Sequence, residues 1–314
     1  MKRLFILAAA TVALASCAKT QVVYNEEPQE IAFKTVSGVM TKGSLDTGED
    51  LGVFAELYDN STDGALYFGN SQFTYNSDSW KAGRYWPISN GLIFTVYSPY
   101  IVGNEKASWN ITTNTLTLEL DENTTNQTDL LYGTTRPHGD RNSGKLPVEL
   151  GHALAQITIN VSAKKNSIVT LKSLKINKTI QSGTCSVTYG NPTSVSWVLG
   201  SAVNEKSLLG EETSLSTTPI TKTCLVVPCN LIEQTLSFTY TLSGADDVNL
   251  VYTTTIKIDE NPNQLGASWV HGKNYIYNIT IDPKQIEFDA TVAGWDANTD
   301  GNAGNGNDET DIEI

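Results

Sequence analysis

The amino-acid sequence predicts an all-β protein made of two tandem β-sandwich domains. The first observation is a hydrophobic pattern of period two, which recurs along almost the whole chain and is typical of strands with one buried face. The second is composition, because only 18% of the residues are charged while Thr, Ser, Asn and Gly are abundant, as in extracellular β-proteins. The third is length, since 314 residues are more than one sandwich needs.

Alternating segments separated by turn residues define the expected strands. Gly-, Asn-, Asp- and Pro-rich clusters lie between these segments, and no window has the periodicity of an amphipathic helix of three turns. The polar loop 136–144 precedes a new alternating run, so we expect an N-terminal sandwich over 31–149 and a C-terminal sandwich over 150–295. The clearest strands are 115–120, 157–161, 236–242 and 275–281.

The N-terminus has the features of a bacterial lipoprotein signal. Lys2 and Arg3 precede an apolar run that ends in Leu-Ala-Ser, directly followed by Cys17, which is the pattern of a lipobox. We expect residues 1–16 to be removed as a signal peptide, Cys17 to be acylated, and residues 17–30 to form a polar tether. The alternative is an ordinary signal peptide followed by a chance cysteine. Ala18 lacks the Asp that commonly retains lipoproteins at the inner membrane, which is compatible with the outer membrane.

Charge and cysteine content narrow the function classes further. A net charge of −13 and a pI near 4.6 disfavour nucleic-acid partners and docking on an anionic membrane surface. Three cysteines remain after Cys17, an odd number, so they cannot all pair. Cys224 and Cys229 are predicted to lie on opposite faces of one strand, which leaves buried free thiols as the expected state. One disulfide from Cys185 to either of them is the alternative.

Motifs for catalysis are missing from the sequence. We find no Gly-x-Ser-x-Gly, His-Glu-x-x-His or phosphate-loop pattern, and the three histidines are scattered, so we expect no enzyme and no cofactor. Asp296, Asn298 and Asp300 have the spacing of a calcium loop, but the twelfth position is Asn307 and no helices are expected beside it. An acidic flexible linker is the alternative for this segment. The aromatic cluster around Trp80, Tyr85, Trp86, Tyr97 and Tyr100 is expected in the core, with a sugar-binding surface as the alternative.

A series of short motifs, in this order, resembles the fimbrillin family of Gram-negative anaerobes over residues 30–295. The resemblance implies two tandem transthyretin-like β-sandwiches and assembly into pili from lipoprotein precursors. It further implies that a protease cuts after a basic residue near the N-terminus, and that the first strand is replaced by a strand from the C-terminal segment of another subunit. The motifs are Ile31-Ala-Phe33, Thr41-Lys-Gly43, Leu51-Gly-Val-Phe-Ala55, Tyr85-Trp-Pro87, Phe94 to Tyr100, Asp129-Leu-Leu-Tyr132, His152-Ala-Leu-Ala155, Trp269 to Tyr275 and Ile286 to Trp295.

The same resemblance implies roles for particular residues. The first strand corresponds to 29–39, and the basic residues near it are Lys34 and Lys42. Because no Arg lies between Arg3 and Arg84, an Arg-specific protease would leave the chain uncut, which favours an anchor, tip or accessory subunit. The acidic tail 296–314 is either a frayed end or a donor strand whose plugs are Ile312 and Ile314.

The predicted function is therefore a structural or accessory subunit of an adhesive cell-surface pilus. Its expected partners are other pilus subunits, joined by strand exchange, and the outer membrane through the lipid on Cys17. The alternative is a surface lipoprotein that does not polymerise and binds a carbohydrate or host ligand.

Overall fold

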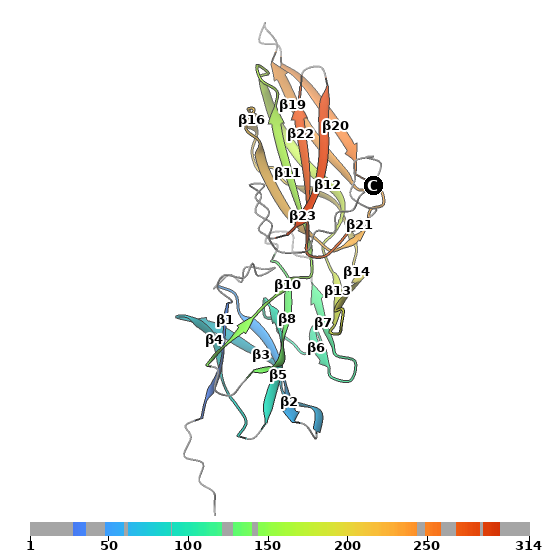
Figure 1. Ribbon diagram of the computed structural model, residues 1–314. Coiled ribbons are helices and arrows are strands. Elements are labelled where there is room, and N and C mark those ends of the chain that lie inside the picture. Colours follow the sequence, from blue (N-terminus) through green and yellow to red (C-terminus); the bar gives the residue numbers. More distant parts are fainter. Residues whose placement is uncertain are drawn as a thin grey trace, which may run out of the picture.

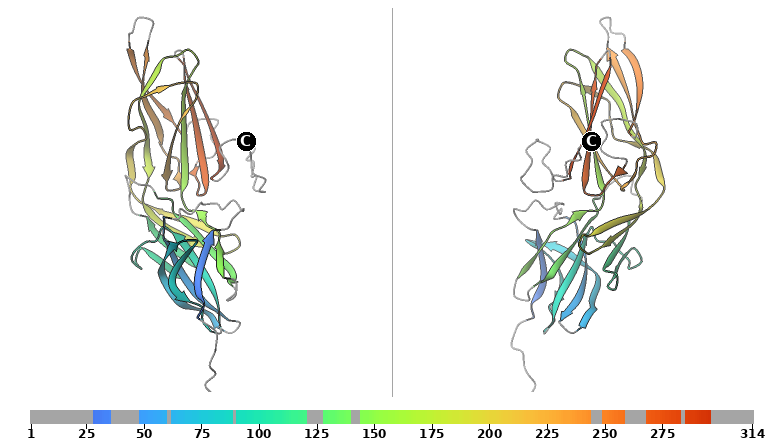
Figure 2. Two further views of the ribbon diagram at one scale, coloured as in Figure 1. Left: turned by 90° about the vertical axis from the view of Figure 1, so that its left-hand side faces the viewer. Right: turned by 45° about the vertical axis from the view of Figure 1, so that its right-hand side comes forward.

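A computed structural model describes residues 28–35, 48–59, 62–88, 90–120, 128–139, 144–243, 249–258, 268–282 and 285–295. Within these ranges every regular element is a strand, which confirms the all-β prediction. Among the same residues, no helix is long and apolar enough to cross a bilayer. The strands form an elongated molecule in which the C-terminal sandwich stands end to end on the N-terminal sheets (Figures 1 and 2).

The N-terminal half is built on one hydrogen-bonded path of eight strands. In spatial order the strands are β10 (Gly151–His152), β8 (Leu131–Gly139), β5 (Gly91–Ser98), β2 (Leu51–Asp59), β3 (Thr62–Asn76), β4 (Ser79–Tyr85), β1 (Glu30–Thr35) and β9 (Lys145–Val148). Strand β3 pairs with β2 along its first part and with β4 near its end. This long strand therefore joins two layers of the path.

The two layers enclose a shared apolar core. Phe33 of β1 packs against Phe94 of β5 with ring centroids 5.2 Å apart, although three strands separate β1 from β5 in the hydrogen-bonded order. That contact requires the path to fold back on itself as a sandwich. Leu51 and Val53 of β2, and Trp80 of β4, belong to the same buried cluster.

The C-terminal half contains two further sheets that face each other across a second core. The first has the order β17 (Ile220–Val226), β11 (Ala155–Ala163), β22 (Lys273–Ile281) and β23 (Ile286–Gly294). The second has β15 (Ala202–Ser207), β12 (Val169–Ile180), β19 (Thr235–Ser243) and β20 (Asn249–Lys257), with β16 (Thr213–Leu215) also paired to β12. Side chains from both sheets make up one buried cluster. The short strands β18 (Cys229–Asn230) and β21 (Ser268–Trp269) pair beside it.

A fifth sheet joins the two halves of the chain. It has the order β14 (Ser194–Leu199), β13 (Gly183–Thr188), β7 (Thr115–Leu120) and β6 (Ala107–Asn110). Because β13 pairs with β7 along its whole length, residues from both sides of position 149 share a sheet and a third buried cluster. The division at residue 149 stays a prediction, and strand pairing crosses it.

The expected strands coincide with observed ones. Residues 115–120 are β7, and the alternating segments 157–161, 236–242 and 275–281 lie inside β11, β19 and β22. Their side chains alternate between the core and the outside, as in β22, where every second residue from Tyr275 to Ile281 is buried. Local periodicity was sufficient here because each of these strands has one face on a core.

The three described cysteines are free and buried, as expected, but one detail of the prediction was wrong. Cys224 lies in β17 and Cys229 in the separate strand β18, and both side chains enter the same core. The chain leaves β17 at Val227 and Pro228, so the two cysteines do not belong to one strand. The odd spacing between them therefore does not place their side chains on opposite faces. Cys185 lies in the cluster that joins the two halves.

We expect these thiols to be chemically inert in the native protein. Burial raises the pKa of Cys185 and Cys224 to about 12 and that of Cys229 to about 11, so almost no thiolate forms at pH 8. A chain beginning at Ala18 should resist alkylation at pH 8 and label at all three cysteines in guanidinium, as measured by mass spectrometry. A Ser194→Cys variant, exposed in β14, is the control that should label when folded. Fast labelling of the unaltered native chain would contradict the burial.

Candidate functional site

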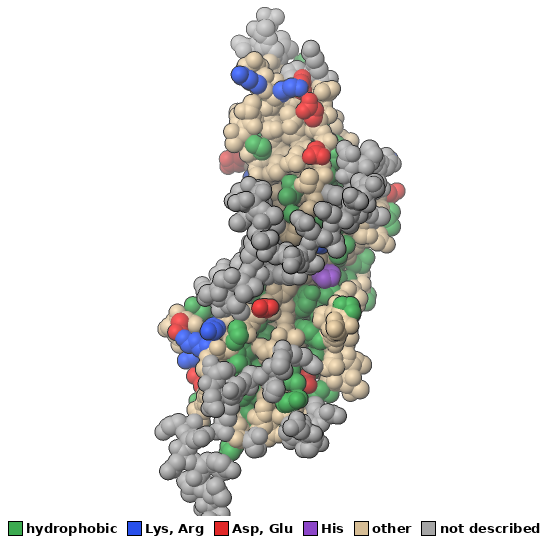
Figure 3. All heavy atoms as spheres, in the orientation of Figure 1, with side chains coloured by type: hydrophobic (Ala, Val, Ile, Leu, Met, Phe, Trp, Pro, Cys, Tyr) green, Lys and Arg blue, Asp and Glu red, His purple; other side chains and the backbone are tan. Residues whose placement is uncertain are grey.

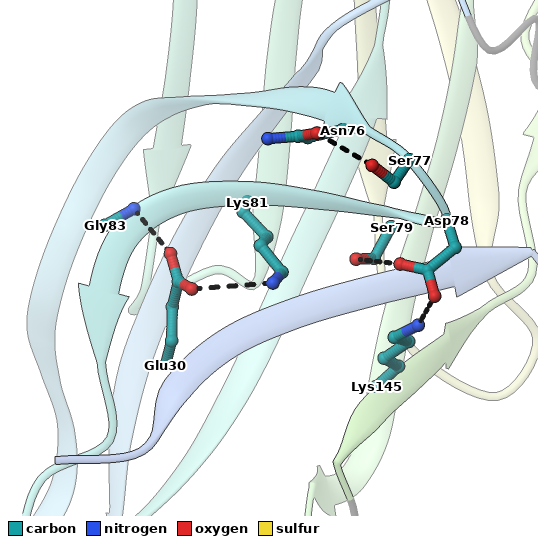
Figure 4. A network of polar contacts seen from close by, with 8 residues as sticks. All are labelled: Glu30, Asn76, Ser77, Asp78, Ser79, Lys81, Gly83 and Lys145. Atoms are coloured by element: carbon teal, nitrogen blue, oxygen red, sulfur yellow. Dashed lines mark hydrogen bonds and ion pairs between the residues drawn. The ribbon is translucent and has the colours of Figure 1, made fainter.

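Strand β1 is an interior strand, held on both sides by neighbours that are distant in sequence. It pairs with β4 in antiparallel register, with Phe33 opposite Trp80, and with β9 in parallel register, with Phe33 opposite Leu146. The strand has six residues, and Figure 4 shows it between the strands that carry Lys81 and Lys145. An interior strand gives up backbone hydrogen bonds on two edges if it leaves the sheet.

Two side chains of β1 anchor it to the N-terminal core. Ile31 and Phe33 are fully buried, and each contributes about 1.5–3 kcal/mol relative to an exposed position. The ring of Phe33 contacts Phe73 and Phe94 in edge-on geometry, with centroids 5.2 Å apart in both pairs. If β1 were absent, the groove between β4 and β9 would have an apolar floor.

The outer face of the site carries a polar network, drawn in Figure 4. Glu30 of β1 accepts a hydrogen bond from the backbone N–H of Gly83 at 3.2 Å and forms an ion pair with Lys81 at 3.7 Å. Lys145 of β9 forms an ion pair with Asp78 in the turn before β4. The hydrogen bond from Lys145 is the main cause that lowers the pKa of the Asp78 carboxyl. A space-filling view shows acidic and basic side chains gathered over β1 and β4 (Figure 3).

The two ion pairs have different relations to the first strand. The Glu30–Lys81 pair joins β1 to its neighbour and would be lost with β1. The Lys145–Asp78 pair joins the two neighbours across β1 and contains no residue of it. Both pairs are solvent-exposed and contribute little to stability, so the apolar anchors dominate the retention of β1.

Most of the lipidation, processing, donor-strand and calcium candidates lie outside the described ranges. These are Cys17, the processing candidate Lys42, the donor-strand candidates Ile312 and Ile314, and the calcium candidates Asp296, Asn298 and Asp300. Lys34 is described and has an exposed side chain near the end of β1. Within the described parts of the chain, no group of three or more His, Cys, Asp or Glu residues could hold a metal ion.

The aromatic cluster of the N-terminal half is largely internal. Trp80, Trp86 and Tyr97 are buried, which agrees with the expected core role. Tyr85 is 47% exposed, and its backbone oxygen accepts a hydrogen bond from the hydroxyl of Tyr67. One exposed ring from this set does not make a flat platform for stacking sugars.

His152 and Trp295 have structural positions at the junction of the two halves. The His152 Nδ1 and Asp129 Oδ2 atoms are 2.5 Å apart, and the indole of Trp295 stacks on the imidazole with centroids 3.7 Å apart. Trp295 therefore packs against the N-terminal half as well as closing β23.

Sequence reasoning missed the strand on the far side of β1. The run Lys-Leu-Pro-Val at 145–148 becomes β9, whose Leu146 and Val148 face the core while Lys145 faces outward. A parallel pairing across more than a hundred residues leaves no local signal. The alternation of this short run was the only available hint.

Together, the fold and the site define an all-β protein of several sheets whose first strand is an inserted interior strand. The chain belongs to the fimbrillin-like family, whose model matches residues 39–295. Membership supports a pilus-related or adhesion role at the cell surface. The matched region begins after β1, so the site joins a strand outside the match to strands within it.

Solved structures with a similar fold include three proteins from Bacteroides species. A fimbrial protein from Bacteroides vulgatus is 18% identical, with a TM-score of 0.61, and the match covers 85% of this chain and 99% of that one. A putative cell adhesion protein from Bacteroides uniformis is 20% identical, with a TM-score of 0.54 and the same coverage. A third, from Bacteroides ovatus and also described as a putative cell adhesion protein, is 13% identical with a TM-score of 0.52, covering 86% and 98%. No curated protein matches the sequence.

Proposed function

We propose that this protein is a structural or accessory subunit of an adhesive cell-surface pilus, and that it joins other subunits by exchanging β1 for a donor strand. The observation that carries the proposal is the position of β1, a six-residue strand between β4 and β9. Such a strand can be replaced by any extended segment that repeats its hydrogen bonds and its alternation. The role is structural, and no catalytic chemistry is assigned to the chain.

The energetics favour replacement over an empty groove. Without β1, the partners of Ile31 and Phe33 and one backbone edge of both β4 and β9 would be exposed to water. Exposed apolar surface next to unpaired strand edges promotes association with another strand. Release of β1 and capture of a donor are therefore coupled steps in this proposal.

Proteolysis is the proposed trigger. A cut after Lys42 would separate the whole of β1, and the acylated Cys17 with it, from the body of the protein. A cut after Lys34 would need the protease to reach backbone that is paired to β9 on one side, since Lys34 lies opposite Pro147. We therefore favour Lys42, which makes the lipid a delivery device for a cut subunit. An uncut subunit would keep Cys17 and remain at the outer membrane as an anchor or accessory protein.

Limited Lys-specific proteolysis tests the proposal. For the chain beginning at Ala18, we expect the first cut after Lys42, a new N-terminus at Gly43, and then oligomers that survive unheated SDS electrophoresis. Lys42→Gln should prevent both the cut and the oligomers, and Lys34→Gln should prevent neither. A chain that is cut after Lys42 and remains monomeric would contradict strand exchange. It would favour a surface lipoprotein that binds its ligand without polymerising.

A further inference from the structure

The groove between β4 and β9, which β1 fills, has one lysine on each side at the same register position. We call Lys81 and Lys145 the lysine rim of the groove. Ala32 lies directly opposite Lys81 of β4 and, on its other side, directly opposite Lys145 of β9. Residues directly opposite each other in paired strands point to the same face. Figure 4 shows the two lysines on the two sides of β1. Both lysines therefore flank Ala32 on the outer face, with side chains that are 42% and 36% exposed. Their ammonium groups are paired with Glu30 and Asp78, and the small Ala32 between them is 6% exposed.

The resident strand makes little use of this rim. Ala32 carries no charge, and the carboxylate of β1 that reaches Lys81 comes from Glu30, at 3.7 Å. Lys145 is paired with Asp78, and its ammonium has three N–H donors, so it can also donate a hydrogen bond to a second carboxylate. When β1 leaves, Lys81 loses Glu30 while Lys145 keeps Asp78. The vacated groove therefore has two apolar pockets with a positively charged position between them.

We propose that this groove selects a strand with an acidic residue between two apolar plugs, and that residues 311–314 of a second copy of the chain provide it. This rests on the strand exchange proposed above and names its partner. Asp311-Ile-Glu-Ile314 repeats the alternation of Glu30-Ile-Ala-Phe33, with Glu313 in place of Ala32. Ile312 and Ile314 would replace the buried Ile31 and Phe33, and Glu313 would lie between Lys81 and Lys145.

The match does not depend on strand direction. The triplet Ile-Glu-Ile is the same in both directions, so Glu313 reaches the central position in a donor parallel or antiparallel to β1. In the direction of β1, Asp311 would also take the place of Glu30 near Lys81. The segment from 296 to 314 contains six acidic residues and no basic one, so its approach to the lysine rim is electrostatically favourable.

Charge selection would compensate for a poorer apolar fit. Ile is smaller than Phe, and a donor with Ile in the Phe33 pocket would give up the edge-on contacts with Phe73 and Phe94. Two cross-strand pairs from Glu313 are interactions that the resident Ala32 cannot make. The groove would therefore hold β1 mainly by shape and the donor by a combination of shape and charge.

Peptide binding to the cut chain tests the selection. The protein is the chain from Ala18 cut after Lys42, with Ile312→Asp and Ile314→Asp so that its own tail does not compete. Fluorescent peptides of residues 306–314 are compared by anisotropy at low salt. Glu313→Gln should weaken binding about two- to thirtyfold, as expected for two cross-strand charge pairs. Glu313→Lys, which faces two lysines, should weaken it further.

Matched variants separate charge selection from other effects. In a Lys81→Gln/Lys145→Gln protein, the unaltered and Glu313→Gln peptides should bind equally. A Lys81→Glu/Lys145→Glu protein should prefer the Glu313→Lys peptide. A Thr310→Lys peptide, with a charge change outside the triplet, and a Lys172→Gln/Lys175→Gln protein, altered on β12, should behave like the unaltered molecules. High salt should reduce the differences, since the lysines are exposed.

The outcomes distinguish the two proposals. Equal binding of the unaltered and Glu313→Lys peptides to the unaltered groove would overturn charge selection and leave strand exchange standing. Failure of every peptide to bind the cut chain would overturn strand exchange, and the selection with it. A preference that follows Glu313 and reverses with the two lysines would support the assignment of residues 311–314 as the donor.

Discussion

Replacing Phe33 with Ala should lower the free energy of unfolding by about 3–5 kcal/mol, the usual cost of truncating a fully buried Phe. The side chain is 0% exposed and its ring packs edge-on against both Phe73 and Phe94. Its removal would leave a cavity between the two layers of the N-terminal sandwich, where β-sheet backbones restrict collapse. Urea denaturation followed by tryptophan fluorescence would measure the loss, because Trp80 and Trp86 are buried in the same core.

The neighbouring Lys34 supplies the control. Its side chain is exposed in the same strand, so Lys34→Ala should change stability by no more than about 0.5 kcal/mol. The Phe33 variant should also form oligomers faster after the Lys42 cut, because a weakened β1 is released more easily. A Phe33→Ala protein as stable as the original would show that β1 does not anchor in the core as described.

Replacing Gly52 with Ala should destabilise the protein by about 3 kcal/mol, at the upper end of the range for overpacking a core. A Cβ atom at position 52 would lie 2.1 Å from two ring carbons of Tyr97 and 2.5 Å from its hydroxyl oxygen. Tyr97 cannot easily move, since it is 0% exposed and its hydroxyl donates to the Asn70 side chain at 2.5 Å. The same hydroxyl accepts from the backbone N–H of Ile101 at 3.2 Å.

Two further variants test the cause of this effect. Gly210→Ala should be nearly neutral, since a Cβ there would meet nothing within 4 Å. Combining Gly52→Ala with Tyr97→Leu should cost less than the sum of the two single changes, because the ring that clashes is gone. Thermal unfolding of the original protein, the Gly52→Ala and Tyr97→Leu single variants and the double variant would provide the comparison. If the destabilisation of the double variant equalled the sum of the two single values, the effect of Gly52→Ala would not come from a clash with the Tyr97 ring.

The strands with one buried face were predictable from local sequence. Thr115–Leu120 alternates between Thr or Glu and Leu, and the observed β7 has the same bounds. The two-residue period is set by backbone geometry, which does not depend on which strand lies alongside. Glycine and proline clusters mark the turns for an equally local reason.

The pairing of strands was not predictable in the same way. Strand β9 lies beside β1 in parallel, and β13 lies beside β7, in each case through contacts between segments far apart in the chain. A strand edge presents the same N–H and C=O groups whatever its sequence, so backbone hydrogen bonding does not specify the partner. The position of the two lysines beside Ala32 follows from this pairing and was absent from the sequence analysis.

The sequence by itself determined the all-β class, the position of the most regularly alternating strands, the family and the sites where processing is expected, because alternation and short motifs are local properties of the chain. Only the tertiary structure decided that β1 is an interior strand, that strand pairing crosses residue 149, and that Lys81 and Lys145 border one position of the groove. These features depend on register between distant strands, which is set by the packing of complete sheets around shared cores.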